Sequence, residues 1–212
     1  MPSVPTRVSP PTSRPRLRAR GAAVIAVSAP HDYVPESVAS DATPEQLEVR
    51  RVARALKQHG AAAFPAAVVQ AARAMRGRLP HHAVVVPVPG AGGSLVGNLA
   101  LAHALVAGRT GMTVVPALAR VIALPSQRLL RLAGQRAQDV DAQRRSLIPR
   151  CVLPADRPVV LVDNLVVSGA TSLAAAIALG RPDAIAVVYA VAPRVPGEAY
   201  YVRRVRPTGR AS

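Results

Sequence analysis

Short runs of apolar residues alternate along the chain with segments in which apolar residues recur at helical spacing. The short runs are rich in Val, Ile and Ala, which is typical of strands that are covered on both faces of a parallel sheet. They predict strands at 22–29, 83–88, 113–118, 158–163 and 184–192. The amphipathic and alanine-rich segments between them predict helices at 44–58, 65–75, 95–107 and 172–179.

The first predicted helix carries a start signal of its own. Thr43 is placed to be the N-cap, Pro44 the first helical residue and Gln46 the reciprocal partner of a capping box.

Strands that alternate with helices indicate an α/β fold with right-handed crossovers. We therefore predict an open, mainly parallel sheet of about five strands flanked by helices. In such sheets ligands bind beyond the carboxyl ends of the strands, so the segments that follow Val88, Leu118 and Asp163 are expected to share one edge.

The composition along the chain predicts one domain with two tails. Residues 1–20 are rich in Pro, Ser and Arg without an acid, which is typical of a disordered basic tail, and 203–212 is similar. The domain is predicted at 21–202. Within it, 121–150 loses the apolar periodicity and indicates a basic flap, or hood. A solvated helix face is the alternative for this segment.

The charge balance is strongly basic. The chain has 27 Lys and Arg against 11 Asp and Glu, for a formal net charge of +16, and it has no acid between Glu48 and Asp139. Such a surface attracts phosphates, and the basic tails are candidates for nucleic-acid contact. Solvated tails are an equally good reading.

Cysteine content and hydropathy limit the cellular compartments in which the protein is expected. The single cysteine, Cys151, excludes an internal disulfide and a multi-cysteine zinc site, and a reducing cytoplasm is the expected compartment. The segment RPRLRARGAAVIAVSA imitates a signal peptide, but a strand explains its apolar part equally well. The uncharged stretch 83–108 contains Pro87, Pro89 and five glycines, so no membrane span is predicted.

The stretch VVLVDNLVVSGAT, residues 159–171, combines features of a sugar-phosphate site. A loop that opens a helix directs N–H groups and the positive helix dipole at one point, where a phosphate binds. Ser168 and Thr171 offer hydroxyl donors, and Gly169 lets the backbone approach closely. Asp163, at the strand end, is suited to accept bonds from sugar hydroxyls or to hold a hydrated magnesium ion. On spacing alone, an ordinary strand-to-helix turn capped by Asp163 explains the stretch equally well.

A second glycine-containing turn, GAGG at 90–93, follows the strand at 83–88. Its backbone amides are able to approach a pyrophosphate, and a plain tight turn is the alternative. The turn lacks the Gly-Lys-Ser/Thr ending of an ATP-hydrolysing loop.

The stretch 159–171 resembles the signature by which type I phosphoribosyltransferases bind phosphoribosyl pyrophosphate (PRPP), in which a strand ends in two acids and a threonine-rich loop follows. Asp163 matches the first acid, Ser168 a loop threonine, and Gly169 and Thr171 the closing Gly and Thr. Asn164 replaces the second acid and Val167 the first loop threonine.

A wider resemblance, over 83–192, is to the ComF-like, competence-associated branch of these proteins. The strand end VVVPVP at 84–89 is similar to its Val-Pro-Val-Pro element, and Arg120, Ser126-Gln127 and Arg136 are similar to the pattern of its hood. Asp139 stands where that branch has Asn, and Gly90 to Ser94 lack its basic residues.

The resemblance implies a phosphoribosyltransferase (a glycosyltransferase) that binds PRPP with Mg²⁺ and transfers ribose 5-phosphate to or from an unidentified, nucleobase-like acceptor. It places the ribose hydroxyls at the catalytic positions Asp163 and Asn164. Mg²⁺ is then bound through PRPP, and Asp163 is the one protein side chain that is a candidate to contact it. The implied 5′-phosphate loop is Val167, Ser168, Gly169, Ala170 and Thr171, the pyrophosphate loop is Pro89, Gly90, Ala91, Gly92 and Gly93, and the hood residues are Arg120, Gln127, Arg131 and Arg136.

The alternative is a ComF-like protein that is catalytically weak or inactive and acts in DNA uptake or nucleic-acid processing through its basic surface. Asn164, Val167 and the net charge favour this reading, whereas an aromatic content of 2% argues against single-strand binding by base stacking. A homodimer is compatible with either reading.

Overall fold

The computed structural model describes residues 23–35, 40–125, 130, 139–194 and 199–206. Its core is a seven-stranded sheet in which every pair of neighbouring strands is parallel. The strand order is β4-β3-β7-β8-β1-β9, and β2 pairs with the far end of β8. The prediction of an open, parallel α/β sheet is confirmed, with more strands than the sequence indicated.

The sheet strands are β1 (Ile25–Ser28), β2 (His31–Asp32), β3 (Ala83–Pro87), β4 (Met112–Val114), β7 (Val159–Val166), β8 (Ile185–Val191) and β9 (Val202–Arg204). The helices are α1 (Pro44–Ala55), α2 (Phe64–Met75), α3 (Val96–Val106), α5 (Val140–Ser146) and α6 (Ala170–Ala178), with a 3₁₀ turn at Arg76–Arg78. A separate antiparallel pair is formed by β5 (Leu118–Arg120) and β6 (Leu147–Pro149).

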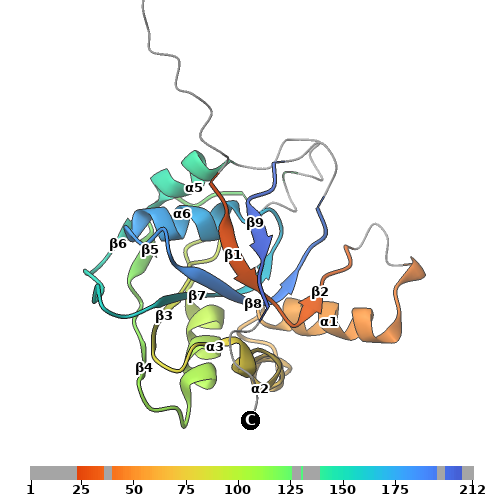
Figure 1. Ribbon diagram of the computed structural model, residues 1–212. Helices are drawn as coiled ribbons and strands as arrows, with labels where there is room; N and C mark the ends of the chain where they lie inside the picture. Colours follow the sequence, from red (N-terminus) through yellow and green to blue (C-terminus); the bar gives the residue numbers. More distant parts are fainter. Residues whose placement is uncertain (1–22, 36–39, 126–129, 131–138, 195–198, 207–212) are drawn as a thin grey trace, which may run out of the picture.

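Helices cover the sheet on both faces (Figure 1). α1, α2 and α3 lie on one face, and α6 with α5 lies on the other. The central strand β7 packs against the helices on both faces of the sheet. Val160 and Val162 lie in the hydrophobic cluster with α1–α3. Val159 and Leu161 lie in the cluster with α6. This two-sided burial explains why the first half of the strand, residues 159–162, is an unbroken apolar run.

The start of α1 is confirmed as predicted. The Thr43 backbone N–H donates to Gln46 Oε1 at 2.8 Å, and the Gln46 N–H donates to Thr43 Oγ1 at 3.3 Å, which completes the capping box. The helix ends at Ala55, three residues before the predicted end.

The predicted strand at 113–118 is wrong as a single element. Met112–Val114 joins the sheet beside β3, whereas Leu118–Arg120 leaves it and pairs antiparallel with β6. Pro116 lies between them, and proline has no N–H to continue a strand ladder.

Two predicted boundaries also move. β7 continues past Asp163 to Val166, because Leu165 and Val166 still pair with β8. The expected start of the C-terminal tail, residue 203, falls inside β9, which pairs with β1 at the edge of the sheet. The predicted N-terminal tail, 1–20, lies outside the described residues.

The predicted flap at 121–150 contains regular structure in its second half, namely α5 and β6. α5 packs on α6, so this segment lies over the helix that follows β7. Within the described part of the chain, no helix is long and apolar enough to cross a membrane.

Candidate functional site

The candidate site lies where β3 ends beside the second half of β7, and there Asp163 is held by two donors. Asn98, in the first turn of α3, directs its side-chain amide Nδ2 to Asp163 Oδ1 at 3.0 Å and to the Val88 carbonyl at 2.7 Å. The backbone N–H of Asn164 donates to the same Asp163 oxygen at 2.8 Å. The ends of two neighbouring strands and the start of α3 therefore meet at one carboxylate, as the parallel sheet requires.

Burial raises the pKa of the Asp163 carboxyl above its ordinary value. The hydrogen bonds from Asn98 and the Asn164 N–H oppose this shift, and the charges of Lys57 and Arg120 oppose it further. Burial also lowers the pKa of Arg120, against the attraction of Asp163. The site thus pairs a carboxylate that is costly to ionise with cations that become more effective in a poorly hydrated setting.

Arg120, the first predicted hood residue, joins three segments. Its Nε donates to the Gly90 carbonyl at 2.8 Å and its Nη2 to the Pro89 carbonyl at 3.4 Å. Its Nη1 donates to the Ser146 hydroxyl at the end of α5. The predicted pyrophosphate turn and the hood are therefore in contact, with an arginine between them.

The glycine turn is closed mainly by its own backbone bonds. The Gly93 N–H donates to the Gly90 carbonyl at 2.9 Å, and Gly93 has a φ of +87°, which glycine adopts without strain. The Ala91 carbonyl accepts from Leu124 N–H at 3.0 Å. Gly92 is exposed, and no atom lies within 4 Å of a Cβ built on it, so this residue faces open space.

The predicted 5′-phosphate loop, Val167 to Thr171, opens α6 as expected. Gly169 is the N-cap residue, with a φ of +84° and no capping side chain, while Ala170 begins the helix in a buried position. The Ser168 hydroxyl is buried and accepts from the Ala170 N–H at 3.4 Å. Val167 is half-buried on the path from β7 into this loop.

Two other parts of the chain bind this loop. The Tyr201 N–H, just before β9, donates to the Ser168 carbonyl at 2.7 Å. On the other side, the Thr171 hydroxyl donates to Gln143 Oε1 of α5 at 3.2 Å. The hydroxyl that was predicted to bind phosphate is thus already bonded to the hood.

Asn164, predicted beside Asp163 at the ribose, does not lie with it. Its side chain is only 6% exposed, and Nδ2 donates to the Ala53 carbonyl of α1 at 3.2 Å. Successive side chains of a strand point to opposite faces, so Asn164 shares the face of Val160 and Val162, which pack in the cluster of α1–α3. The structure assigns Asn164 a role in fixing α1 to β7.

The remaining hood predictions, Gln127, Arg131 and Arg136, lie outside the described residues.

Three polar residues of this edge were missed by the sequence analysis: Asn98, Gln143 and Ser146. Asn98 had a signal, since it is a polar residue in the first turn of an otherwise apolar helix that follows the glycine turn. Gln143 and Ser146 lie in a polar segment with little periodicity, and only the packing of α5 on α6 brings them to the site.

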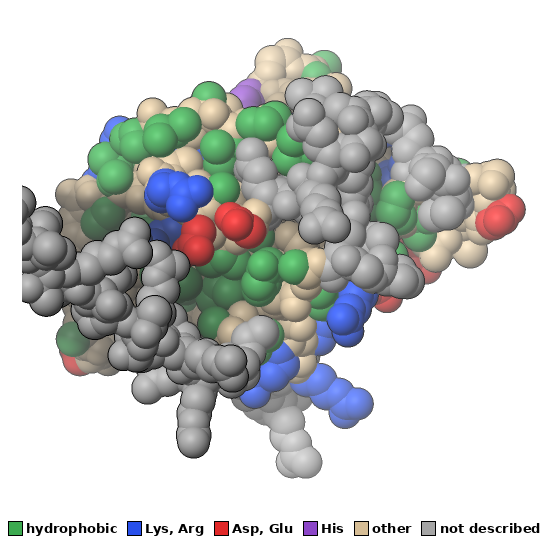
Figure 2. Space-filling model, turned by 90° about the horizontal axis from the view of Figure 1, so that it is seen from above, with side chains coloured by type: hydrophobic (Ala, Val, Ile, Leu, Met, Phe, Trp, Pro, Cys, Tyr) green, Lys and Arg blue, Asp and Glu red, His purple; other side chains and the backbone are tan. Residues whose placement is uncertain are grey.

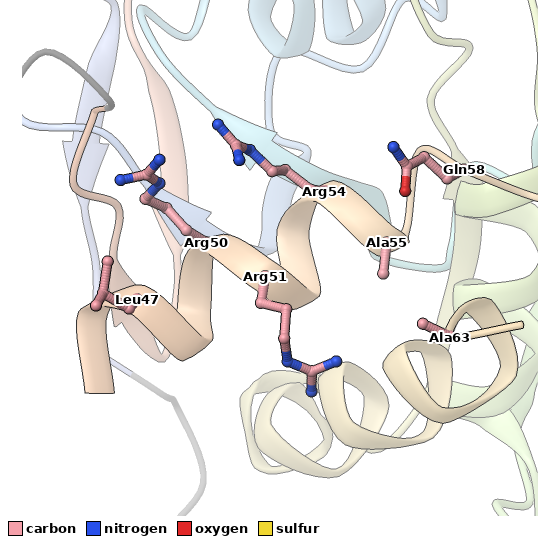
Figure 3. Close-up of a pocket in the computed structure, with 7 residues that line it drawn as sticks. All are labelled: Leu47, Arg50, Arg51, Arg54, Ala55, Gln58 and Ala63. Carbon is pink, nitrogen blue, oxygen red and sulfur yellow. The ribbon is translucent and has the colours of Figure 1, made fainter. Parts of the chain in front are cut away.

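A cavity of about 420 Å³ lies along α1 and the start of α2 (Figure 3). The lining residues are Leu47, Arg50, Arg51, Arg54, Ala55, Gln58 and Ala63. Arg51 points to the opposite side of the helix from Arg50 and Arg54, and it binds both carboxylate oxygens of Glu48, at 2.6 and 2.7 Å. These bonds lower the pKa of Glu48 to about 2. The cavity is separate from the Asp163 carboxylate, although Asn164 ties the end of α1 to the same strand.

The surface on the side of α5 and α6 does not carry a single continuous basic patch among the described residues. Figure 2 shows Lys and Arg side chains in separate groups there, with hydrophobic side chains between them. The exposed large hydrophobic residues of β6, α6 and the loops next to β5 and β6 are Val121, Ile122, Ile148, Val152 and Ile177.

In the described part of the chain, no three His, Cys, Asp or Glu side chains form a metal cluster. A carboxylate such as that of Asp163 is the type of oxygen ligand that Mg²⁺ binds. Comparison of the chain with protein-family models and with curated proteins gives no match.

Proposed function

We propose that the chain is a phosphoribosyltransferase-like protein that binds PRPP with Mg²⁺ and transfers ribose 5-phosphate to or from a nucleobase-like acceptor. The observation that carries this proposal is the position of Asp163. It lies at the carboxyl edge of the sheet, on the strand that leads directly through Ser168 and Gly169 into the start of α6. The segment from β7 into α6 therefore carries both a carboxylate that suits sugar hydroxyls and a helix start that suits a phosphate.

Each contact of the proposed ligand has a residue suited to it. Asp163 accepts hydrogen bonds from the ribose hydroxyls, and Asn98 fixes the orientation of that carboxylate. The 5′-phosphate binds at Ser168–Thr171, where the Thr171 hydroxyl exchanges Gln143 for a phosphate oxygen. The pyrophosphate lies against the glycine turn at the open space beside Gly92, and Arg120, which is bonded to the Gly90 carbonyl, holds that turn and supplies a positive charge next to it.

The reaction breaks the bond from ribose C1 to a pyrophosphate oxygen, which leaves with the electron pair, and forms a bond from C1 to the acceptor. Mg²⁺, when bound, neutralises charge on the pyrophosphate. The residues of the chain position the two reactants and supply donors where negative charge develops, which are the main contributions of a protein to such a reaction. Arg120 is the cation best placed to supply such a donor, because it contacts the pyrophosphate turn directly.

A catalytically weak, ComF-like protein is the second candidate, and the position of Asn164 favours it. Where the type I signature has a second acid, this chain has a neutral side chain that bonds to α1 instead of the Asp163 region. In that case the same site binds a sugar phosphate without efficient transfer, and the net charge of +16 supports contact with nucleic acid.

Calorimetric titration of the protein with PRPP, with and without Mg²⁺, tests the proposal. The variants are Asp163→Asn, which preserves shape and removes the charge, and Asp156→Asn, an exposed acid outside the site, as the matched control. Magnesium-dependent binding that Asp163→Asn weakens and Asp156→Asn retains supports the proposal. Folded wild-type protein that does not bind PRPP at low salt contradicts it. If such protein binds a short DNA duplex in a salt-sensitive way, the second candidate takes its place.

A further inference from the structure

The opposite edge of the sheet contains a second, smaller cavity of about 240 Å³. Its lining residues are His81, His82, Gly108, Arg109 and Thr110. His82 immediately precedes β3, and Thr110 lies just before β4, so the cavity is at the amino ends of these two parallel strands. Asp163 and the start of α6 lie at the carboxyl ends, so the two sites are on opposite edges.

Two glycines shape one wall of this cavity. Gly108, with a φ of +72°, turns the chain after α3, and Gly111, with a φ of +77°, leads it into β4. A Cβ atom on Gly111 would overlap the imidazole of His82. The ring therefore rests directly on the backbone of the loop that carries Arg109 and Thr110, so the histidine and the loop form one surface.

The surroundings of the cavity are cationic. Arg109 donates from Nη1 to the Arg76 carbonyl at 2.7 Å, which uses one of the five N–H donors of its guanidinium. Behind the loop, Arg157 donates to the Gly111 carbonyl and, at 3.0 Å, to the Ala83 carbonyl. None of the lining residues is an acid.

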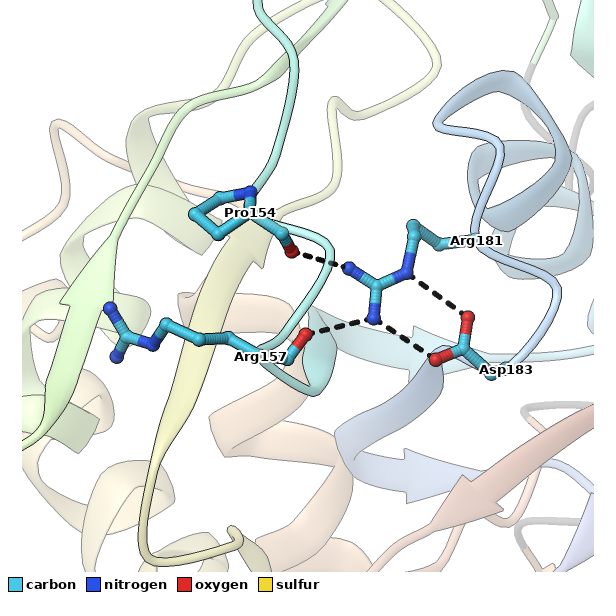
Figure 4. A network of polar contacts seen from close by, with 4 residues as sticks. All are labelled: Pro154, Arg157, Arg181 and Asp183. Atoms are coloured by element: carbon cyan, nitrogen blue, oxygen red, sulfur yellow. Dashed lines mark hydrogen bonds and ion pairs between the residues drawn. The ribbon is translucent and has the colours of Figure 1, made fainter.

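Asp183, the acid bonded to the nearby Arg181, does not neutralise the positive charge around this cavity. Asp183 is bonded to both Nε and Nη2 of Arg181, at 3.1 and 3.0 Å. In Figure 4 the side chain of Arg157 points away from that pair, and only its carbonyl accepts from Arg181. The charge of Arg157 is therefore added to that of Arg109.

We propose that this cavity is a binding site for the phosphate group of a small molecule, separate from the Asp163 site. The residues that line it carry donors on two loops: the two imidazoles, the guanidinium of Arg109 and the Thr110 hydroxyl. Several donors that converge from different sides match the oxygens of a tetrahedral anion, and arginine binds such oxygens with charge-assisted hydrogen bonds. Arg109 and Arg157 repel a metal cation, which distinguishes this histidine pair from a metal site.

Proton NMR of the histidine rings tests this proposal, with inorganic phosphate as the probe. The chain has five histidines, and the variants His81→Ala and His82→Ala assign the two signals of the cavity. Phosphate is added at constant pH and ionic strength, with chloride as the comparison. We expect the His81 and His82 signals to move in a saturable way, while His31, packed on Tyr189 in β8, stays in place.

His59 reports on the other edge, because its ring is bonded to Ser94 at 3.3 Å, next to the glycine turn. The experiments can therefore contradict the proposal for this cavity and the proposal for the Asp163 site separately. Movement of His59 alone, or of no histidine, overturns the proposal for the second cavity and leaves the PRPP experiment unaffected.

The variant Arg109→Ala is expected to weaken the phosphate-dependent movement at least about tenfold, as the loss of a charged hydrogen-bond donor predicts. Arg144→Ala, an exposed arginine of α5, is the matched control and should leave the titration unchanged. Circular dichroism of each variant confirms the fold. An equal titration in Arg109→Ala overturns the proposal, as does a response to a short DNA duplex without any response to inorganic phosphate.

Discussion

The side-chain amide of Asn98 and the carboxylate of Asp163 are hydrogen-bonded at 3.0 Å, across 65 positions of sequence. The acid is thus oriented by a neutral group, while Lys57 and Arg120 act on it only through their charges. An amide fixes the orientation of the carboxylate without neutralising it. Its negative charge therefore remains available to a ligand.

Asp163→Asn should stabilise the protein at neutral pH while it weakens PRPP binding. Because burial raises the folded-state pKa above 3.8, the folded state holds a proton where the unfolded chain has released it. The contribution of the Asp163 carboxyl to the free energy of unfolding therefore falls as pH rises from about 3.8 through the raised pKa. Asn does not ionise, so the variant does not lose this free energy. Thermal melts at pH 4 and pH 7 check this: we expect a gain in Tm of a few degrees at the higher pH only. A lower Tm for the variant at pH 7 would contradict the assignment.

Asn98→Ala should shift the pH dependence of Mg²⁺–PRPP binding to higher pH. Removal of the amide takes away the strongest of the contacts that lower the pKa of Asp163, so the carboxylate form needed by the ligand appears only at higher pH. Affinity measured across a pH series should give a curve displaced upward relative to the wild type. His103→Ala, on the same helix, is the control, and an unshifted curve for Asn98→Ala would show that Asn98 does not orient the acid.

Gly169→Ala should destabilise the protein by about 1–3 kcal/mol, since it places a side chain at a positive φ. A Cβ here also lies 2.7 Å from Val202 Cγ2 and 3.3 Å from the Tyr201 carbonyl carbon. Gly92→Ala is the matched substitution, because no atom lies within 4 Å of its Cβ, and its stability should be close to that of the wild type. Urea unfolding of both variants measures the difference, and equal midpoints would argue against the packing of β9 on this loop.

Arg181→Ala should cost about 1–3 kcal/mol of unfolding free energy, the range for hydrogen bonds to a charged group. Its guanidinium donates to the Pro154 carbonyl at 3.0 Å and the Arg157 carbonyl at 2.8 Å, in addition to the Asp183 carboxylate (Figure 4). This network fastens the turn before β7 to the turn before β8. Arg51→Ala breaks the exposed ion pair with Glu48 and should change the stability much less. The comparison requires denaturant curves for both, and similar losses would show that the two backbone bonds contribute little.

The parallel sheet could be predicted because each of its buried strands is an apolar run, and the capping box of α1 because its signal lies within four consecutive residues. The strands that were missed are short, and the missed helix α5 lies in a polar segment without apolar periodicity. β2, β6 and β9 contain two or three residues each, so no periodicity develops in them. β9 also carries two exposed arginines, and it is a strand only because β1 provides a partner.

The positions of the candidate residues could be predicted where they depend on chain connectivity. Asp163 and the loop after it follow one another in sequence, and Arg120 is the last residue of β5. The family resemblance placed Asn164 beside Asp163 at the ribose, but alternation along the extended strand separates their side chains. Gln143 and Asn98 could not be placed, because their positions depend on how separate helices pack on the sheet.

β1 lies between β8 and β9, so both of its partners are encoded far downstream. During synthesis Ile25–Ser28 leaves the ribosome with its N–H and C=O groups unpaired, and β8 follows only on the order of ten seconds later at roughly 5–20 residues per second. The β7 edge that β8 will cover is open for a much shorter time, because β8 follows β7 closely in the chain. Completion of the sheet is therefore a late event in the life of the nascent chain, and the interval before it is when an exposed strand edge is most open to aggregation or to chaperone capture.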